Sequence, residues 1–112
     1  MMNWDAALAF ALSLPDVVEG VHYGKPAAKL ATNGRAFLGL GREPDRAFVL
    51  HLDLETVALL VETAPDSFYQ TPHYEGWPAV LVRHDAPDED RVRALIERAR
   101  DQAAAMPKAR RR

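Results

Sequence analysis

Residues 67–82 read SFYQTPHYEGWPAVLV and hold four aromatic residues, a histidine, two prolines and a glycine. The last part, AVLV at 79–82, is typical of a β-strand because β-branched and apolar residues run together. Before it, Pro72, Gly76 and Pro78 interrupt any regular element. A loop with so many large side chains is costly to order unless they pack against something. We therefore predict a loop pinned onto the domain, with a short strand near 68–70 and a full strand at 79–83.

Composition narrows the class of protein. The chain has 112 residues, 48% hydrophobic and 27% charged, which fits one globular domain with one core. It has no cysteine, which excludes disulfides, thiolate metal sites and cysteine nucleophiles, and suits a reducing cytoplasm. No apolar run approaches the roughly 20 residues that cross a bilayer, and the first residues lack the basic region of a signal peptide. We expect neither membrane contact nor secretion.

The net charge of -2 hides an uneven distribution along the chain. Four of the 14 basic residues lie in 107–112, which leaves 10 against 16 acidic residues elsewhere. The segment 21–52 is nevertheless locally basic, with five Lys or Arg residues against Glu43 and Asp45. We predict a single domain at 1–106 and a mobile basic tail at 107–112.

Periodicity and end signals predict alternating helices and strands. Asn3, Asp53 and the acidic stretch 85–90 are helix starts, and Pro15 ends the first helix. Asn33-Gly34 is the strongest hairpin signal, typical of a two-residue type I′ turn, and 15–26 reads as connector and entry loop. The expected elements fall at residues 4–14, 27–32, 35–41, 47–52, 54–63, 79–83 and about 89–104.

This order predicts an α+β fold. A helix, a three-strand meander, a helix, one or two further strands and a last helix form a two-layer sandwich. We expect an antiparallel sheet of about four to five strands with the helices on one face.

The sequence offers no catalytic constellation. The only serines are Ser13 and Ser67, and neither has a nucleophile-elbow context. No nucleophile, base and orienting group can be assembled, so we expect no enzyme activity. No histidines have metal-ligand spacing, so we expect neither a metal nor another cofactor.

Two loops with similar sequences are candidates for a binding site. One contains His22-Tyr23 and the other His73-Tyr74 with Trp77, each followed by glycine and proline. If the loops meet at one end of the sheet, these side chains line a pocket for a small ligand or another protein. The alternative is that the tyrosines and the tryptophan plug the core while the histidines bond the loops.

A second candidate is a basic hairpin. It could lie in a nucleic-acid groove as a wing, with Asn33-Gly34 at its tip and the tail adding phosphate contacts. The alternative is a solvated sheet edge on which cations discourage aggregation. The basic residues concerned are Lys25, Lys29, Arg35, Arg42 and Arg46.

The motif T-x-H-Y-x-G-W-P at 71–78, with Leu14-Pro15, YGKPA at 23–27 and Asp53, resembles the MmcQ/YjbR family of small bacterial proteins. The resemblance extends from Trp4 to about Ala104. It implies a YjbR-like α+β fold akin to secretion chaperones, and a non-enzymatic DNA-binding function with two wings. A DNA site requires Lys25, Lys29 and Arg35 on one exposed face. A protein or small-ligand site requires the side chains of the second loop to be partly exposed.

Overall fold

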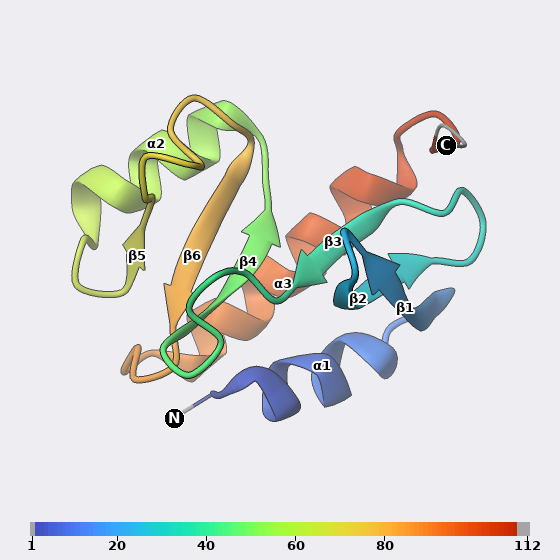
Figure 1. The fold of residues 1–112 in the computed structure, drawn as a ribbon, viewed down its shortest axis with the longest axis horizontal. Helices are drawn as coiled ribbons and strands as arrows, with labels where there is room; N and C mark the ends of the chain where they lie inside the picture. The colour runs from blue at the N-terminus through green and yellow to red at the C-terminus, as the bar shows by residue number, and fades with distance from the viewer. Residues whose placement is uncertain (1, 110–112) are drawn as a thin grey trace.

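The computed structural model describes residues 2–109 and contains three helices and six strands (Figure 1). The strands form one antiparallel sheet in the order β1-β2-β3-β4-β6-β5. The predicted α+β class with an antiparallel sheet is confirmed, and the sheet has six strands. In chain order the elements are α1 (Trp4–Leu12), β1 (Val17–His22), β2 (Lys25–Leu30), β3 (Ala36–Gly39), β4 (Ala47–His51), α2 (Leu54–Thr63), β5 (Phe68–Tyr69), β6 (Ala79–Arg83) and α3 (Glu89–Ala104).

Each helix begins at a side-chain cap. The side-chain oxygens of Asn3, Asp53 and Asp88 accept from the backbone N–H three residues further on, at 2.9 to 3.1 Å. Such caps satisfy one of the donors that a helix start leaves without a partner. The cap of α2 is also tied to α3, because Gln102 donates to the Asp53 carboxylate at 2.6 Å and accepts from its backbone N–H at 3.0 Å.

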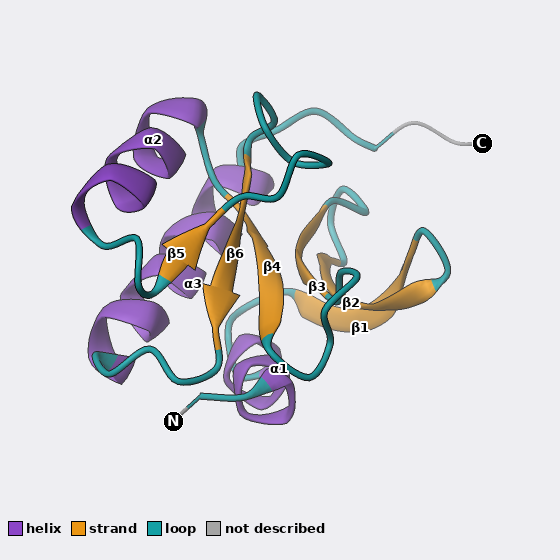
Figure 2. Ribbon diagram, turned by 60° about the vertical axis from the view of Figure 1, so that its left-hand side comes forward, coloured by secondary structure: helices purple, strands orange, loops and turns teal. Residues whose placement is uncertain are grey.

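The helices cover one face of the sheet. In Figure 1 α3 runs behind the strands, and the strong twist of the sheet is clear in Figure 2. Alternate strand residues, such as Phe48 and Leu50 of β4 and Val80 and Val82 of β6, point to the helices and are fully buried. These residues and the inner faces of the helices form the main core.

The central strands are also covered on their other face. Ala47, Val49, Ala79 and Leu81 form a second buried cluster, against which Tyr69 and Tyr74 pack. Tyr74 belongs to the loop between β5 and β6, which folds back over the strands. Both faces of β4 and β6 are therefore apolar.

The connector predicted at 15–26 is wrong, because Val17–His22 is the edge strand β1. It pairs with β2 in regular register from Val17↔Leu30 to His22↔Lys25. The turn between them is Tyr23-Gly24, with φ of 52° and 77°. Two consecutive positive φ angles define the type I′ hairpin turn, so the tight hairpin lies here.

The type I′ turn predicted at Asn33-Gly34 is also wrong. Gly34 has a φ of 74°, whereas Asn33 does not share the positive value. Asn33 is buried, and its side-chain amide donates to the carbonyls of Ala103 at 2.8 Å and Met106 at 3.1 Å. The turn is an anchor for the end of α3, not a protruding wing tip.

The residues after α3 continue along this turn. Arg35 Nε donates to the Pro107 carbonyl, and the Ala109 N–H donates to the Asn33 carbonyl, both at 2.8 Å. The predicted tail thus begins with two contacts to the β2–β3 turn. Its last three residues, 110–112, lie outside the described residues.

Candidate functional site

The face of the sheet opposite the helices is called the open face here. Residues that are cross-strand partners point to the same side, so the strand registers define it. Its strand residues are Val18, Gly20, His22, Lys25, Ala27, Lys29, Gly39, Ala47, Val49, His51, Tyr69, Ala79, Leu81 and Arg83. None of these strand residues is Asp or Glu, and three are Lys or Arg.

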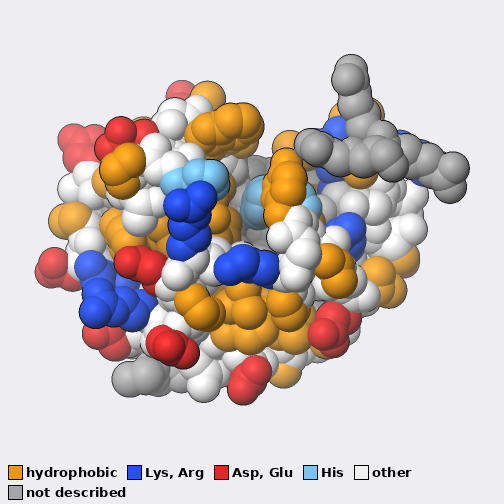
Figure 3. All heavy atoms as spheres, viewed as in Figure 1, with side chains coloured by type: hydrophobic (Ala, Val, Ile, Leu, Met, Phe, Trp, Pro, Cys, Tyr) orange, Lys and Arg blue, Asp and Glu red, His pale blue; other side chains and the backbone are white. Residues whose placement is uncertain are grey.

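Acidic residues gather instead on the helical layer. Nine of the 16 lie in the three helices or at their N-caps. Figure 3 shows Lys and Arg side chains beside the histidines in the middle of the face seen in Figure 1, with most Asp and Glu towards the rim. The open face therefore carries positive charge and the helical layer carries negative charge, although the net charge of the chain is only -2.

The two candidate loops meet at Gly41. Lys25 Nζ, from the first loop, donates to the Gly41 carbonyl at 2.9 Å. The Tyr74 hydroxyl, from the second loop, would be 3.2 Å from a Cβ placed at position 41, and Val49 Cγ2 would be 2.9 Å away. Glycine is favoured at this position because a side chain would crowd Val49 of β4 and the Tyr74 hydroxyl of the second loop.

A row of imidazole and phenol rings crosses the open face from β1 to β4. The His22 ring centroid is 4.4 Å from that of Tyr23 and 5.6 Å from that of His51. Burial, together with the neighbouring His22, lowers the pKa of His51 to about 4, so His51 is neutral at pH 7. The strong curl of the sheet brings together two strands that are not neighbours.

The second loop is held by one side chain. Gln70 Nε2 donates to the carbonyls of Tyr74 at 2.9 Å, Trp77 at 3.2 Å and Ala79 at 2.8 Å. The His73 ring lies 4.8 Å from the Tyr74 ring, edge to face. Burial raises the pKa of the Tyr74 hydroxyl. This is the pinned loop that the sequence indicated.

Trp77 is not a core plug. Its side chain is 64% exposed, and Tyr23 is 77% exposed. Trp77 lines a small pocket of about 280 Å³ against the first turns of α2. The lining residues are Leu54, Val57, Ala58, Gln70, Gly76 and Trp77.

The comparison with known families completes this description. A family model described as YjbR matches residues 12–102. The chain belongs to the YjbR family. The matched segment runs from the end of α1 to the last turn of α3, and so includes every strand and both loops. None of the curated proteins matches the chain.

The five basic residues that were predicted to bind nucleic acid lie in three places of this YjbR chain. Lys25 and Lys29 lie on the open face of β2. Arg42 and Arg46 are exposed in the β3–β4 loop, whereas Arg35 follows the turn at the far end of β2 and bonds the Pro107 carbonyl. The predicted DNA site needs Lys25, Lys29 and Arg35 on one face, but Arg35 does not share the strand positions of the two lysines.

Sequence reasoning missed two members of the open face of the YjbR chain. His51 alternates with Val49 and Ala47 along β4, which places it on this face. Arg83 lies over the Tyr69 ring at 4.7 Å. The Tyr69 hydroxyl in turn donates to Glu43, and burial with this carboxylate raises the pKa of Tyr69 to about 12.

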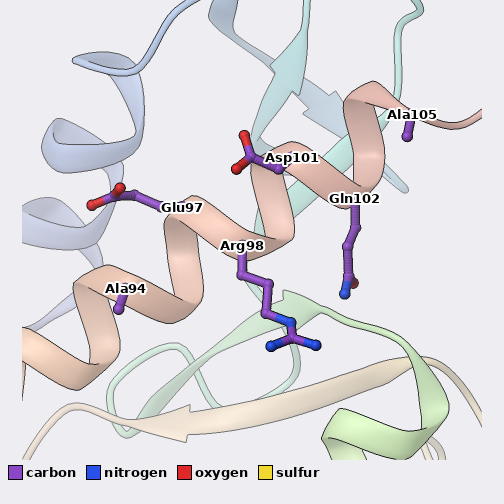
Figure 4. Close-up of a pocket in the computed structure, with 6 residues that line it drawn as sticks. All are labelled: Ala94, Glu97, Arg98, Asp101, Gln102 and Ala105. Atoms are coloured by element: carbon purple, nitrogen blue, oxygen red, sulfur yellow. The ribbon is translucent and has the colours of Figure 1, made fainter.

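A wider depression lies on the opposite, helical side of the YjbR fold. It has a volume of about 680 Å³ and follows one face of α3. Figure 4 shows Arg98 and Gln102 pointing to one side of the helix, and Glu97 and Asp101 to the other. Charges of both signs on diverging side chains do not form a binding site for one ion.

Within 2–109 no three His, Cys, Asp or Glu side chains are grouped as metal ligands would be. In that range no helix combines the length and the apolar character that crossing a bilayer requires.

Proposed function

We propose that this YjbR-family protein is a non-enzymatic DNA-binding module that contacts DNA phosphates with its open face. The observation that carries the proposal is the sorting of charge between the layers. Strand residues of the open face include Lys25, Lys29 and Arg83 and no carboxylate, while nine acidic residues belong to the helices and their caps. Phosphate neutralisation by Lys and Arg is the main sequence-independent source of affinity for DNA.

The acidic total does not oppose this proposal. Charges are screened over about 8 Å at physiological ionic strength. The sheet separates the open face from the outer surface of the helices by the thickness of the core. A phosphate on the open face therefore responds mainly to Lys25, Lys29 and Arg83, because Glu43 and Asp45 offset the two arginines of the β3–β4 loop.

The hairpin β1–β2 is the wing in this proposal. Its tip, Tyr23-Gly24, is exposed, and Lys25 follows directly after it. A two-stranded ribbon is narrow enough to enter the major groove. This hairpin takes the role that the sequence had suggested for the Asn33-Gly34 turn.

The proposal includes the absence of catalysis. The open face of the described strands carries no serine or threonine, and the ring neighbour of His51 is the His22 imidazole. A histidine base in a hydrolase needs both a nucleophile and an orienting group. Neither stands beside His51.

The test is duplex binding as a function of salt concentration. Changing Lys25 and Lys29 together to Gln should weaken binding and reduce the slope of log K against log salt by about two, one per phosphate contact. The matched control is Arg98→Gln, which removes one charge from the helical side. Changing the three terminal arginines, 110–112, to Gln separates the tail from the folded domain without removing the contacts of Pro107 and Ala109.

Three outcomes contradict the proposal. The first is that the wild-type chain does not bind duplex DNA even at low salt. The second is that the Lys25/Lys29 variant and Arg98→Gln lose the same amount of affinity. The third is that binding disappears when only the terminal arginines are changed. The last outcome would reduce DNA binding to attraction by the tail.

The pocket beside Trp77 favours a second function, the binding of a protein partner or a small ligand. Its lining is almost wholly apolar. Its volume of about 280 Å³ is below the roughly 300–1,000 Å³ of typical small-molecule sites, so an apolar side chain of a protein suits it best. Titration with a peptide carrying one exposed Leu or Phe should shift Trp77 fluorescence, and Ala58→Trp should abolish the shift by filling the pocket.

A further inference from the structure

Among the described residues, the two most exposed large hydrophobic side chains belong to the two candidate loops. Tyr23 is 77% exposed and Trp77 is 64% exposed. Aromatic side chains contribute most to a small core when buried, yet these two add little to it. Both therefore require an explanation other than stability.

The backbone conformation of Tyr23 is also unfavourable for a large side chain. Its φ of 52° is unusual for a large side chain. The first position of a type I′ turn favours Asn, Asp or Gly. Such strain tends to persist where function requires it, and the Tyr23 ring here is held out in solvent with the His22 ring against it.

Tyr23 begins a row of rings that runs towards the second loop, which carries Trp77. From Tyr23 the row passes to His22 and then to His51, at ring distances of 4.4 and 5.6 Å. His51 is the cross-strand partner of Ala79, whose N–H donates to the Trp77 carbonyl at 2.8 Å. Figure 3 shows a hollow in this part of the face with histidine side chains beside it.

Basic groups lie along the same row. Lys25 is the cross-strand partner of His22, and Lys29 lies over Gly20 on the same face, with its Cδ 3.1 Å from where a Cβ of residue 20 would be. The row therefore combines flat aromatic rings with cations in a part of the sheet whose strand positions on this face include no Asp or Glu.

We propose that this row binds single-stranded nucleic acid, with unpaired bases stacking on Tyr23 and Trp77 and the backbone phosphates contacting Lys25 and Lys29. The inference rests on the proposed function and makes it more specific. In a duplex the faces of the bases are occupied by their neighbours, so exposed aromatic rings gain nothing from it. Stacking platforms beside a basic track are the usual means of binding single strands.

The experiment compares oligomers of thymidine, oligomers of uridine and a mixed-sequence duplex, each of about 12 nucleotides, by fluorescence anisotropy with the full chain. Single strands should bind more tightly than the duplex. Tyr23→Ala and Trp77→Ala should each weaken single-strand binding roughly tenfold, as expected for one stacked base. Trp77→Ala, which lies outside the proposed wing, should leave duplex binding unchanged. Tyr23→Phe and Trp77→Phe should restore most of the affinity because they keep a flat ring.

Leu59→Ala is the matched control, because Leu59 is 56% exposed on α2 and lies outside the row. Lys25→Gln with Lys29→Gln should weaken both kinds of binding. Uridine oligomers that bind as well as thymidine oligomers would extend the proposal to RNA. Thermal melts of every variant should match the wild type within a few degrees, because neither ring is in the core.

Duplex binding that depends on the lysines, with no preference for single strands and no effect of the two alanine variants, would overturn this inference and leave the proposed function intact. Absence of binding to all three nucleic acids at low salt would overturn both.

Discussion

Asn33→Ala tests how the sheet holds the end of α3. The Asn33 side chain is buried and makes three hydrogen bonds. Its amide donates to the carbonyls of Ala103 at 2.8 Å and Met106 at 3.1 Å, and its oxygen accepts from the Arg35 N–H at 3.0 Å. Ala103 lies in the last turn of α3, and Met106 follows the end of the helix. Alanine removes all three bonds and leaves the Ala103 carbonyl without this donor.

The expected loss follows from these contacts. A net contribution of about 1 kcal/mol for each of the three hydrogen bonds predicts a loss of about 3 kcal/mol. That is a large part of the roughly 5–15 kcal/mol that stabilises an ordinary domain. At roughly 4 °C per kcal/mol for a chain of this size, the melting temperature should fall by about 12 °C.

The assay is urea unfolding followed by circular dichroism, with Thr32→Ala in the same turn as the exposed control. Asn33→Gly discriminates between two explanations of this residue. If Asn33 were present for a type I′ turn, glycine would be tolerated. We assign the Asn33 side chain a hydrogen-bonding role instead, so Asn33→Gly should destabilise the protein about as much as Asn33→Ala. A loss below 1 kcal/mol in Asn33→Ala, or a stable Asn33→Gly variant, would refute the reasoning.

Three further predictions concern other anchors. Hydrogen bonds lower the pKa of Asp53 to about 2, so its contribution is complete above pH 4 and is lost as the pH falls through 2. Asp53→Ala should cost about 1–2 kcal/mol at pH 7, and urea unfolding should show the difference shrinking between pH 4 and pH 2. Gly41→Ala should cost about 1–3 kcal/mol in thermal melts, because Val49 and Tyr74 must move. Trp77→Ala should lower the free energy of unfolding by less than about 1 kcal/mol, because the ring is exposed. A buried ring that plugs the core would instead cost about 3 kcal/mol or more. A measured loss of that size would therefore support the core-plug interpretation.

The helices could be predicted because their signals are local. A cap at Asn3, Asp53 or Asp88 bonds a backbone group three residues away, and no distant part of the chain is needed to decide it. The strand at Ala79–Arg83 was predicted for the same reason, since its apolar run is bounded by Pro78.

The edge strand β1 could not be predicted in this way. Pro15, Asp16 and Gly20 read as turn residues, and the exposed side of the strand shows no apolar alternation. Its backbone is ordered by pairing with β2, which is information from elsewhere in the chain. The two hairpin signals were misjudged for a related reason. Asn33 has the side chain of a turn residue but uses it to bond α3, while Tyr23 takes the left-handed conformation that its residue type disfavours.

The residues of the candidate site could be assigned to one face from the strand register, and less well from the composition of the chain. Alternation within β2 places Lys25, Ala27 and Lys29 on one side, but it cannot say which side of the sheet that is. The pairing of β2 with β1 and β3 decides it, and it also places only neutral or basic strand residues beside the two lysines. A one-residue slip of β2 would turn both lysines into the core beneath α3, at a desolvation cost far above what the strand could recover. The burial of Ala28 and Leu30 therefore fixes the basic face as firmly as it fixes the fold, and the proposed phosphate contacts depend on the same register.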